Sequence, residues 1–244
     1  MTELLGSMTA FENPKPNRLL IELLNVCSGQ DSIVLDFFAG SGTTAHSVLE
    51  LNKINGNRKF ILVQLPEPTG QIDLPTIADI TNERGRRVIK KLNESEAGQL
   101  PLGAPQDRGF RVFKLAESNF NSWNARVEQD AAALARQLEM HIEHIRDERT
   151  SADILYEILL KCGFALTTPV ETLTLAGKQV FSVAGGALFI CLETELTMDV
   201  IRAMAAQKPE RVVCLDSGFA GNDQLKANAV QIFKTQGIPG FKTV

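Results

Sequence analysis

The chain has 244 residues, 44% of them hydrophobic and 22% charged, and its formal net charge is −4. Such a composition is typical of a globular protein with one large domain or two small ones. The negative charge gives no support to nucleic-acid binding by bulk electrostatics. No run approaches the ~20 apolar residues of a membrane span, and the first residues lack the basic and apolar regions of a signal peptide. We therefore expect a cytoplasmic protein without a membrane partner, whose four scattered cysteines are reduced thiols.

The first half of the chain predicts a βαβ unit. Its expected elements are, in chain order, a helix over 17–26, a strand over 33–36, a helix over 43–52, a strand over 58–65, a helix over 76–92 and a strand over 110–115. Asn17 is the expected N-cap of the first helix. A strand, a helix and a second strand within about 35 residues require a parallel pair joined by a crossover.

The second half predicts a separate, smaller α/β unit that follows a long polar helix over 126–150. Its expected elements are a helix over 151–162 that ends at Gly163, hairpin strands over 170–175 and 180–183, a strand over 187–192, a helix over 198–206, a strand over 211–216 and a helix over 223–235. Ser151 is the expected cap of the first of these helices. Asp153 and Asp216, at element ends, are typical of caps or turns and not of an acid–base pair.

A glycine-rich turn follows the first predicted strand. Residues 36–44, Asp-Phe-Phe-Ala-Gly-Ser-Gly-Thr-Thr, form what we call the glycine loop. Glycine lets a backbone come close to a ligand, and the N-terminus of the next helix favours an anion. A dinucleotide site shares this loose pattern, but it needs an acidic residue at the end of the second strand, where Gln64 stands. The remaining alternative is a tight turn that binds nothing.

The glycine loop resembles the S-adenosylmethionine loop of amino-methylating DNA methyltransferases. Further blocks in the same order resemble the modification subunit of type III restriction-modification systems, and together they cover nearly the whole chain. These blocks are residues 11–16, 60–68, 77–84, 109–115, 209–216 and 221–229. The resemblance implies the C-terminal portion of such a subunit.

The resemblance also implies an architecture. We expect an α/β fold in which a partial Rossmann-like methyltransferase sheet precedes a smaller C-terminal α/β domain. The expected domains are a cofactor-binding half of a methyltransferase domain over 1–125, the linking helix over 126–150 and the C-terminal domain over 151–244. Because the family's sheet continues beyond the first strand on its catalytic side, an exposed apolar strand edge is expected here.

The cofactor implied by the resemblance is S-adenosylmethionine, and the implied contacts cluster around the glycine loop. The loop backbone around Phe38, Gly40 and Gly42 would wrap the methionine part next to Asp36, while Thr43 and Thr44 would cap the following helix and could bind the carboxylate at its N-terminus. Gln64 would face the ribose, where related enzymes often have a carboxylate. The remaining expected contacts close over the same end of the cofactor and come from Asn13, Lys15 and Pro16.

The implied reaction is methyl transfer to adenine N6 of a flipped base, with cytosine N4 as the alternative. The chain contains no Asp/Asn/Ser-Pro-Pro-Tyr/Phe motif, with which the family does this chemistry. No catalytic residue is therefore assigned, and this chain alone is expected to be inactive. Implied partners are DNA in the full-length subunit, a second copy in a homodimer and the restriction (helicase-nuclease) subunit. The alternative is a non-enzymatic self-association or docking module with a vestigial cofactor fold.

Three other features favour structural interpretations. The basic residues of 84–91 suggest phosphate contacts, but a solvated helix face is the simpler interpretation. His46, just after the glycine loop, could touch the cofactor, but a place at the surface is expected. His141 and His144 lie one helical turn apart without further ligands in view, so no metal site is expected.

Overall fold

The computed structural model describes residues 13–97, 106–121 and 145–244 of the chain, which divides into two compact units, Met1–Phe113 and Lys114–Val244. Trp123, His141 and His144 and most of the expected linking helix lie outside the described residues, and the predicted domain boundaries stay a prediction. Residues 145–150 form an isolated bridge and a turn, so the helix predicted to end at residue 150 does not reach that far.

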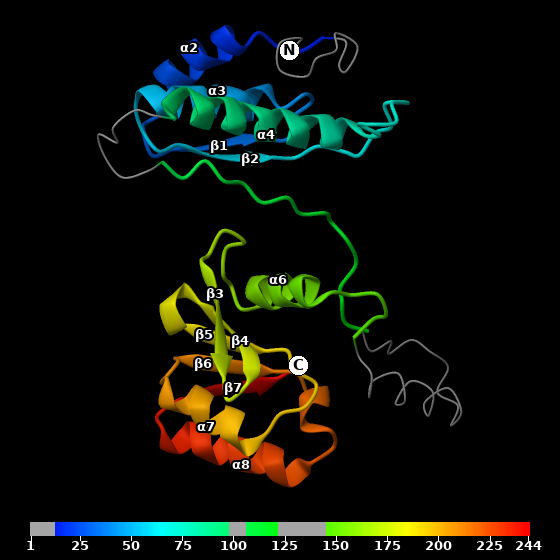
Figure 1. The fold of residues 1–244 in the computed structure, drawn as a ribbon, viewed down its shortest axis with the longest axis vertical. Coiled ribbons are helices and arrows are strands. Elements are labelled where there is room, and N and C mark those ends of the chain that lie inside the picture. The colour runs from blue at the N-terminus through cyan, green and yellow to red at the C-terminus, as the bar shows by residue number, and fades with distance from the viewer. Residues whose placement is uncertain (1–12, 98–105, 122–144) are drawn as a thin grey trace. The chain divides into compact units, whose positions relative to one another are not determined.

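The first unit is mixed α/β and contains the predicted βαβ arrangement (Figure 1). Strands β1 (Ile33–Asp36) and β2 (Lys59–Leu62) pair in parallel, with Val34 opposite Phe60. Helix α3 (Thr43–Ile54) connects the two strands, so the prediction from strand, helix and strand is confirmed. The other helices of this unit are α2 (Asn17–Cys27) and α4 (Ile77–Glu96).

Two local predictions in this unit are wrong. Pro16 occupies the N-cap of α2, and Asn17 is already helical; its Oδ1 instead accepts a hydrogen bond of 2.6 Å from Ser47 Oγ of α3. Residues 110–115 form no strand. The Phe110 ring packs against α4 at Gly85, where a Cβ would lie 3.2 Å from ring atom Cε1. This alternating segment therefore packs its apolar side on a helix and does not pair with a strand.

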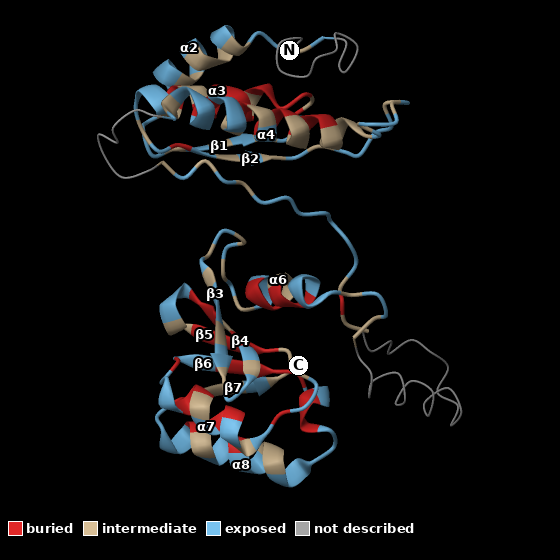
Figure 2. Ribbon diagram, in the orientation of Figure 1, coloured by how far each residue is buried: buried red, intermediate tan, exposed pale blue. Residues whose placement is uncertain are grey.

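The two faces of the β1–β2 pair differ in their cover. Helices α3 and α4 lie on one side (Figure 1), where Phe60 packs on the buried Leu49, Val88 and Leu92. The opposite face is apolar and largely exposed. Its side chains retain 50–67% of their surface and are those of Ile33, Leu35, Ile61, Val63 and Leu65. Figure 2 shows exposed and intermediate residues along both strands.

The second unit is an α/β sandwich around a five-stranded sheet in the order β3-β4-β5-β6-β7. The β3–β4 and β4–β5 pairs are antiparallel, and the β5–β6 and β6–β7 pairs are parallel. The strands are β3 (Val170–Leu175), β4 (Lys178–Val183), β5 (Leu188–Cys191), β6 (Arg211–Cys214) and β7 (Gly240–Thr243), and the helices are α6 (Ser151–Lys161), α7 (Met198–Ala206) and α8 (Asp223–Thr235). The hairpin and all three helices are confirmed, whereas β7 was missed.

Side chains of alternate strand residues enter two hydrophobic cores of this sheet. Leu188 and Ile190 of β5 pack with residues of α6, whereas Phe189 and Cys191 pack with residues of α7 and α8. Burial on both faces explains why β5 is an unbroken apolar run. The same burial raises the pKa of the Cys191 thiol, consistent with a reduced core cysteine.

Helix α6 begins at a capping box. Thr150 Oγ1 accepts from the Asp153 N–H, and the Asp153 carboxylate accepts from the Thr150 N–H, so Thr150 and not Ser151 is the cap. Asp153 is confirmed as a capping residue.

Within the described ranges, no helix has the length and apolar character needed to cross a membrane. Those ranges also contain no cluster of three metal-ligating side chains.

Candidate functional site

The glycine loop lies at the carboxyl end of β1 and is closed by Asp36. Asp36 Oδ1 accepts from the Phe38 N–H at 3.1 Å, and Oδ2 accepts from the Thr44 hydroxyl at 2.6 Å. One carboxylate thus joins the start of the loop to the first turn of α3. Because bonds to an ionised acceptor are stronger than neutral ones, Asp36 fixes the loop more firmly than an amide could.

The loop is also fastened to the end of β2. The Ala39 N–H donates to the Val63 carbonyl at 3.1 Å, and the Gly40 N–H donates to Gln64 Oε1 at 2.7 Å. Gln64 Nε2 donates in turn to the Leu65 carbonyl at 3.1 Å. In this structure Gln64 therefore holds the loop, and its expected contact with a ribose stays a prediction.

Helix α4 contacts the loop through Thr81. Thr81 Oγ1 donates to the Gly40 carbonyl at 2.6 Å. Gly42 has φ +74°, and a Cβ on it would lie 3.1 Å from the Thr81 carbonyl oxygen. A side chain at Gly42 would meet both a disfavoured backbone conformation and the backbone of α4. The sequence thus needs glycine here so that α3 can begin in contact with α4.

Arg84 of α4 is buried beneath the loop, with 2% of its surface exposed. Its Nη1 donates to Thr43 Oγ1 at 2.7 Å and to Ser41 Oγ at 3.0 Å, and its Nη2 lies 3.1 Å from His46 Nδ1. The solvated-face interpretation is therefore wrong for Arg84, although it holds for Arg86. The signal was present in the sequence, since Arg84 falls within the apolar stripe of α4 that includes Ile80 and Val88.

His46 is buried as well, which corrects its expected place at the surface. Burial, followed by the nearby charge of Arg84, lowers the pKa of His46 to about 4 although Glu50 opposes the shift. The imidazole is therefore neutral at pH 7. With Arg84 donating to Nδ1, the proton belongs on Nε2, which lies 3.3 Å from Glu50 Oε1.

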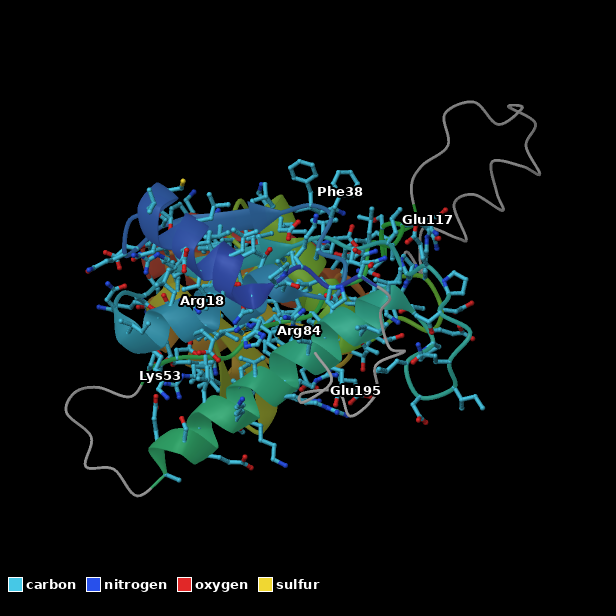
Figure 3. All side chains as sticks on the ribbon, turned by 90° about the horizontal axis from the view of Figure 1, so that it is seen from above. Arg18, Phe38, Lys53, Arg84, Glu117 and Glu195 are labelled. Atoms are coloured by element: carbon cyan, nitrogen blue, oxygen red, sulfur yellow. The ribbon has the colours of Figure 1, made fainter. Side chains whose placement is uncertain are left out.

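Phe38 gives the site an exposed aromatic surface. Its side chain is 82% exposed and projects away from the ribbon (Figure 3). The Phe37 and Phe38 ring centroids are 5.1 Å apart with tilted planes. An exposed ring beside a loop of backbone N–H groups is suited to stack on a flat, aromatic part of a ligand.

The predicted residues before α2 lie at the edge of this region. Asn13 and Lys15 are exposed, and Pro16 occupies the helix N-cap. The Ser47–Asn17 hydrogen bond anchors the start of α2 on α3, one turn beyond Thr43. The described residues show no hydrogen bond from Asn13 or Lys15 to the glycine loop, and their role stays a prediction.

Three of the other basic side chains of α4, those of Arg86, Arg87 and Lys90, lie near acidic side chains of the same helix. Arg87 Nε pairs with Glu83 at 2.6 Å, Arg86 lies 4.0 Å from the same carboxylate, and Lys90 lies 3.8 Å from Glu94. These exposed pairs are typical of a solvated helix face, which favours that interpretation over a dedicated phosphate site.

The chain is similar in sequence to known DNA-modifying proteins. Residues 3–67 match a family model described as DNA methylase. The Type III restriction-modification enzyme EcoP15I Mod subunit of Escherichia coli is 30% identical over 93% of this chain and 34% of that subunit. The EcoPI Mod subunit of Escherichia phage P1 is 28% identical over 93% of this chain and 35% of its own length. The Type II methyltransferase M.KpnI of Klebsiella pneumoniae is 36% identical over 34% of this chain and 22% of its own. The chain spans about a third of the two subunits that it matches.

Proposed function

Because this chain is related over nearly its whole length to the modification subunits of type III restriction-modification enzymes, we propose that its glycine loop binds S-adenosylmethionine for DNA methylation. The observation that carries the proposal is the loop itself. It follows the carboxyl end of a parallel strand, precedes a helix N-terminus and is fixed by hydrogen bonds that Asp36 and Gln64 accept and that Thr81 donates. Ligands of α/β sheets bind at such strand ends.

In this proposal each part of the cofactor has a matching group. The methionine carboxylate lies at the N-terminus of α3, where Thr43 and backbone N–H groups are donors. The loop backbone around Phe38, Gly40 and Gly42 wraps the methionine part, while the exposed ring of Phe38 stacks on the adenine. Gln64 turns from Gly40 to the ribose hydroxyls. The segment with Asn13, Lys15 and Pro16 closes over the methionine end. The fold that we infer is part of a Rossmann-like methyltransferase sheet.

The proposed reaction moves the methyl group of the sulfonium to adenine N6, with cytosine N4 as the alternative acceptor, and releases S-adenosylhomocysteine and a proton. The 244 residues contain no Pro-Pro dipeptide. We therefore assign cofactor binding to this chain and the alignment of the base to residues outside it. Incubation of the chain with DNA and labelled S-adenosylmethionine should give no methylated DNA, and turnover would contradict this assignment.

The proposed partners follow from the relatives' names and from the exposed face of the first unit. We infer DNA and a restriction subunit as partners of the assembled enzyme. We also infer self-association through the exposed apolar face of β1 and β2, because exposed patches of this kind favour association.

Calorimetric titration of the chain with S-adenosylmethionine tests the proposal. Asp36→Ala removes both hydrogen bonds that close the loop, and since bonds to a charged group contribute about 1.5–3 kcal/mol each, we expect at least a tenfold loss of affinity. Gly40→Val should abolish binding. Asp31→Ala, at an exposed turn before β1, is the matched control and should bind like the wild type. A folded chain that binds no S-adenosylmethionine would instead support the vestigial, non-enzymatic module, and tighter binding of NAD would support a dinucleotide site.

A further inference from the structure

Arg84 is a buried cation without a counter-charge among the described residues. Burial lowers its pKa to about 10, so the guanidinium stays protonated at neutral pH. Its hydrogen-bond partners are the Ser41 and Thr43 hydroxyls, the Ser41 carbonyl and the neutral His46 ring. Within the part of the chain that the structure describes, no carboxylate pairs with it, and its Nε has no hydrogen-bond partner. Burying a charge without an opposite charge beside it costs free energy.

The position of Arg84 increases the free-energy cost of burying its charge. Thr43, which accepts from Arg84 Nη1 at 2.7 Å, is the first residue of α3. The N-terminus of a helix carries partial positive charge, and a cation placed there is repelled by it. Arg84 and α3 therefore both add positive potential at one point, where the Asp36 carboxylate accepts from Thr44 of the first turn but makes no ion pair with Arg84. An anionic group that binds in front of the helix is attracted both by the charge of Arg84 and by the N-terminus of α3.

We propose that Arg84 is the positioning residue that makes the glycine loop select a ligand with a carboxylate, acting through the hydroxyls of Ser41 and Thr43. This inference rests on the proposed function, in which the ligand is S-adenosylmethionine and the carboxylate is that of its methionine end. Arg84 does not touch the cofactor in this account. It holds the two hydroxyls and supplies the charge that the bound carboxylate neutralises.

The arrangement of the Ser41 and Thr43 hydroxyls fits such a relay, in which Arg84 acts on the ligand through them. Ser41 Oγ and Thr43 Oγ1 both accept from Arg84 Nη1 and lie 3.3 Å from each other. Each oxygen keeps its own hydrogen, and even if one hydrogen bridges the two oxygens, the other remains to donate to a ligand. A hydroxyl that accepts from a cation is a stronger donor to an anion than an isolated hydroxyl. A neutral residue at position 84 could hold the hydroxyls but could not supply the charge.

The test compares S-adenosylmethionine with decarboxylated S-adenosylmethionine, which lacks only the carboxylate, by calorimetry on the 244-residue chain. We expect the wild type to prefer S-adenosylmethionine by at least about tenfold, which corresponds to about 1.4 kcal/mol. In Arg84→Gln this preference should fall to about threefold or less, with little change for the decarboxylated ligand. Arg84→Lys should keep the preference because it keeps the charge, and Arg86→Gln, an exposed change on the same helix, should not alter it.

The outcomes separate this inference from the proposed function. If the wild type binds neither ligand, the proposed function fails and this inference fails with it. If the wild type binds both and Arg84→Gln weakens both by the same factor, the proposed function stands and Arg84 has only a structural role. An unchanged preference in Arg84→Gln would also overturn the inference. If circular dichroism shows that Arg84→Gln is unfolded, Thr43→Val decides: selective loss for the carboxylate ligand supports the relay, and equal loss refutes it.

Discussion

The side-chain oxygen Oε1 of Gln64 accepts a 2.7 Å hydrogen bond from the backbone N–H of Gly40, so the end of one strand of the parallel pair holds the loop that follows the other. This contact gives the Gly40 N–H its hydrogen-bond partner. A ligand that uses either group must replace the contact. Gln64 is thus a point at which the stability of the loop and the binding of a ribose compete.

Substitution of Gln64 separates these two effects. Gln64→Glu keeps an acceptor for the Gly40 N–H and adds a negative charge, and charge-assisted bonds are roughly twice as strong as neutral ones. We expect S-adenosylmethionine to bind Gln64→Glu severalfold more tightly than the wild type, and Gln64→Ala more weakly, in calorimetric titrations. Equal affinities in all three proteins would show that Gln64 does not reach the ribose.

Gly42→Ala tests the contact between the loop and α4, with Gly70→Ala as the matched control. Both glycines have φ +74°, but a Cβ on Gly42 would lie 3.1 Å from the Thr81 carbonyl oxygen, whereas a Cβ on Gly70 would meet nothing within 4 Å. A left-handed backbone costs an L-residue about 1–2 kcal/mol at either site.

We expect Gly42→Ala to lower the free energy of unfolding by more than Gly70→Ala, measured by hydrogen exchange of α3 amides, and to weaken binding of S-adenosylmethionine. The difference between the two losses of stability measures the crowding against Thr81, because both variants carry the same backbone strain. Equal losses of stability in the two variants would mean that α4 does not confine the loop.

The second unit should respond to acid at Glu157. This carboxylate accepts from Ser118 Oγ at 2.5 Å, from the Asn119 N–H at 2.6 Å and from Lys161 Nζ at 2.8 Å. Burial raises its pKa, but the hydrogen bonds from Lys161, Ser118 and Asn119 outweigh burial and hold the pKa below its ordinary value of 4.5.

A lowered pKa in the folded state means that the stabilisation from Glu157 is complete above pH 4.5 and is lost as the pH falls through the folded-state value. We expect the amide resonance of Asn119 to follow this titration in nuclear magnetic resonance spectra. Glu157→Gln should remove the pH dependence. An Asn119 resonance that titrates equally in both proteins would show that another group is responsible.

Leu35→Lys tests whether the exposed face of β1 and β2 drives self-association. Leu35 is 57% exposed, and substitutions at such sites usually change stability by no more than about 0.5 kcal/mol. The variant should therefore keep its circular dichroism spectrum and its affinity for S-adenosylmethionine. In sedimentation velocity it should be more monomeric than the wild type at the same concentration. Identical sedimentation of the two proteins would remove this face as the cause of association.

The sequence predicted the parts of the fold that local pattern decides. The β1–α3–β2 unit, the hairpin of β3 and β4 and helices α7 and α8 appear where periodicity and turn residues predicted them. Strand β7 was missed because four residues after a Gly-Ile-Pro turn carry little pattern, and pairing with β6 determines their structure. The strand over 110–115 was predicted wrongly because alternation cannot distinguish pairing with a neighbouring strand from packing of Phe110 on α4 at Gly85.

The candidate site shows the same limit. The glycine loop was evident from its glycines, but the residues that hold it from α4, Thr81 and Arg84, lie about 40 positions later in the chain. Arg84 was grouped with its basic neighbours because charge is visible in a sequence and burial is not. Its place in an apolar stripe was the available clue, and only the tertiary contact with Thr43 gives it meaning.

The structure of the chain bound to S-adenosylmethionine tests the central claim most directly. The account predicts the cofactor in the bend between Asp36 and Thr44, with its carboxylate at the start of α3 and its adenine near Phe38. A bend that stays filled by the chain's own side chains while the cofactor binds elsewhere would contradict it.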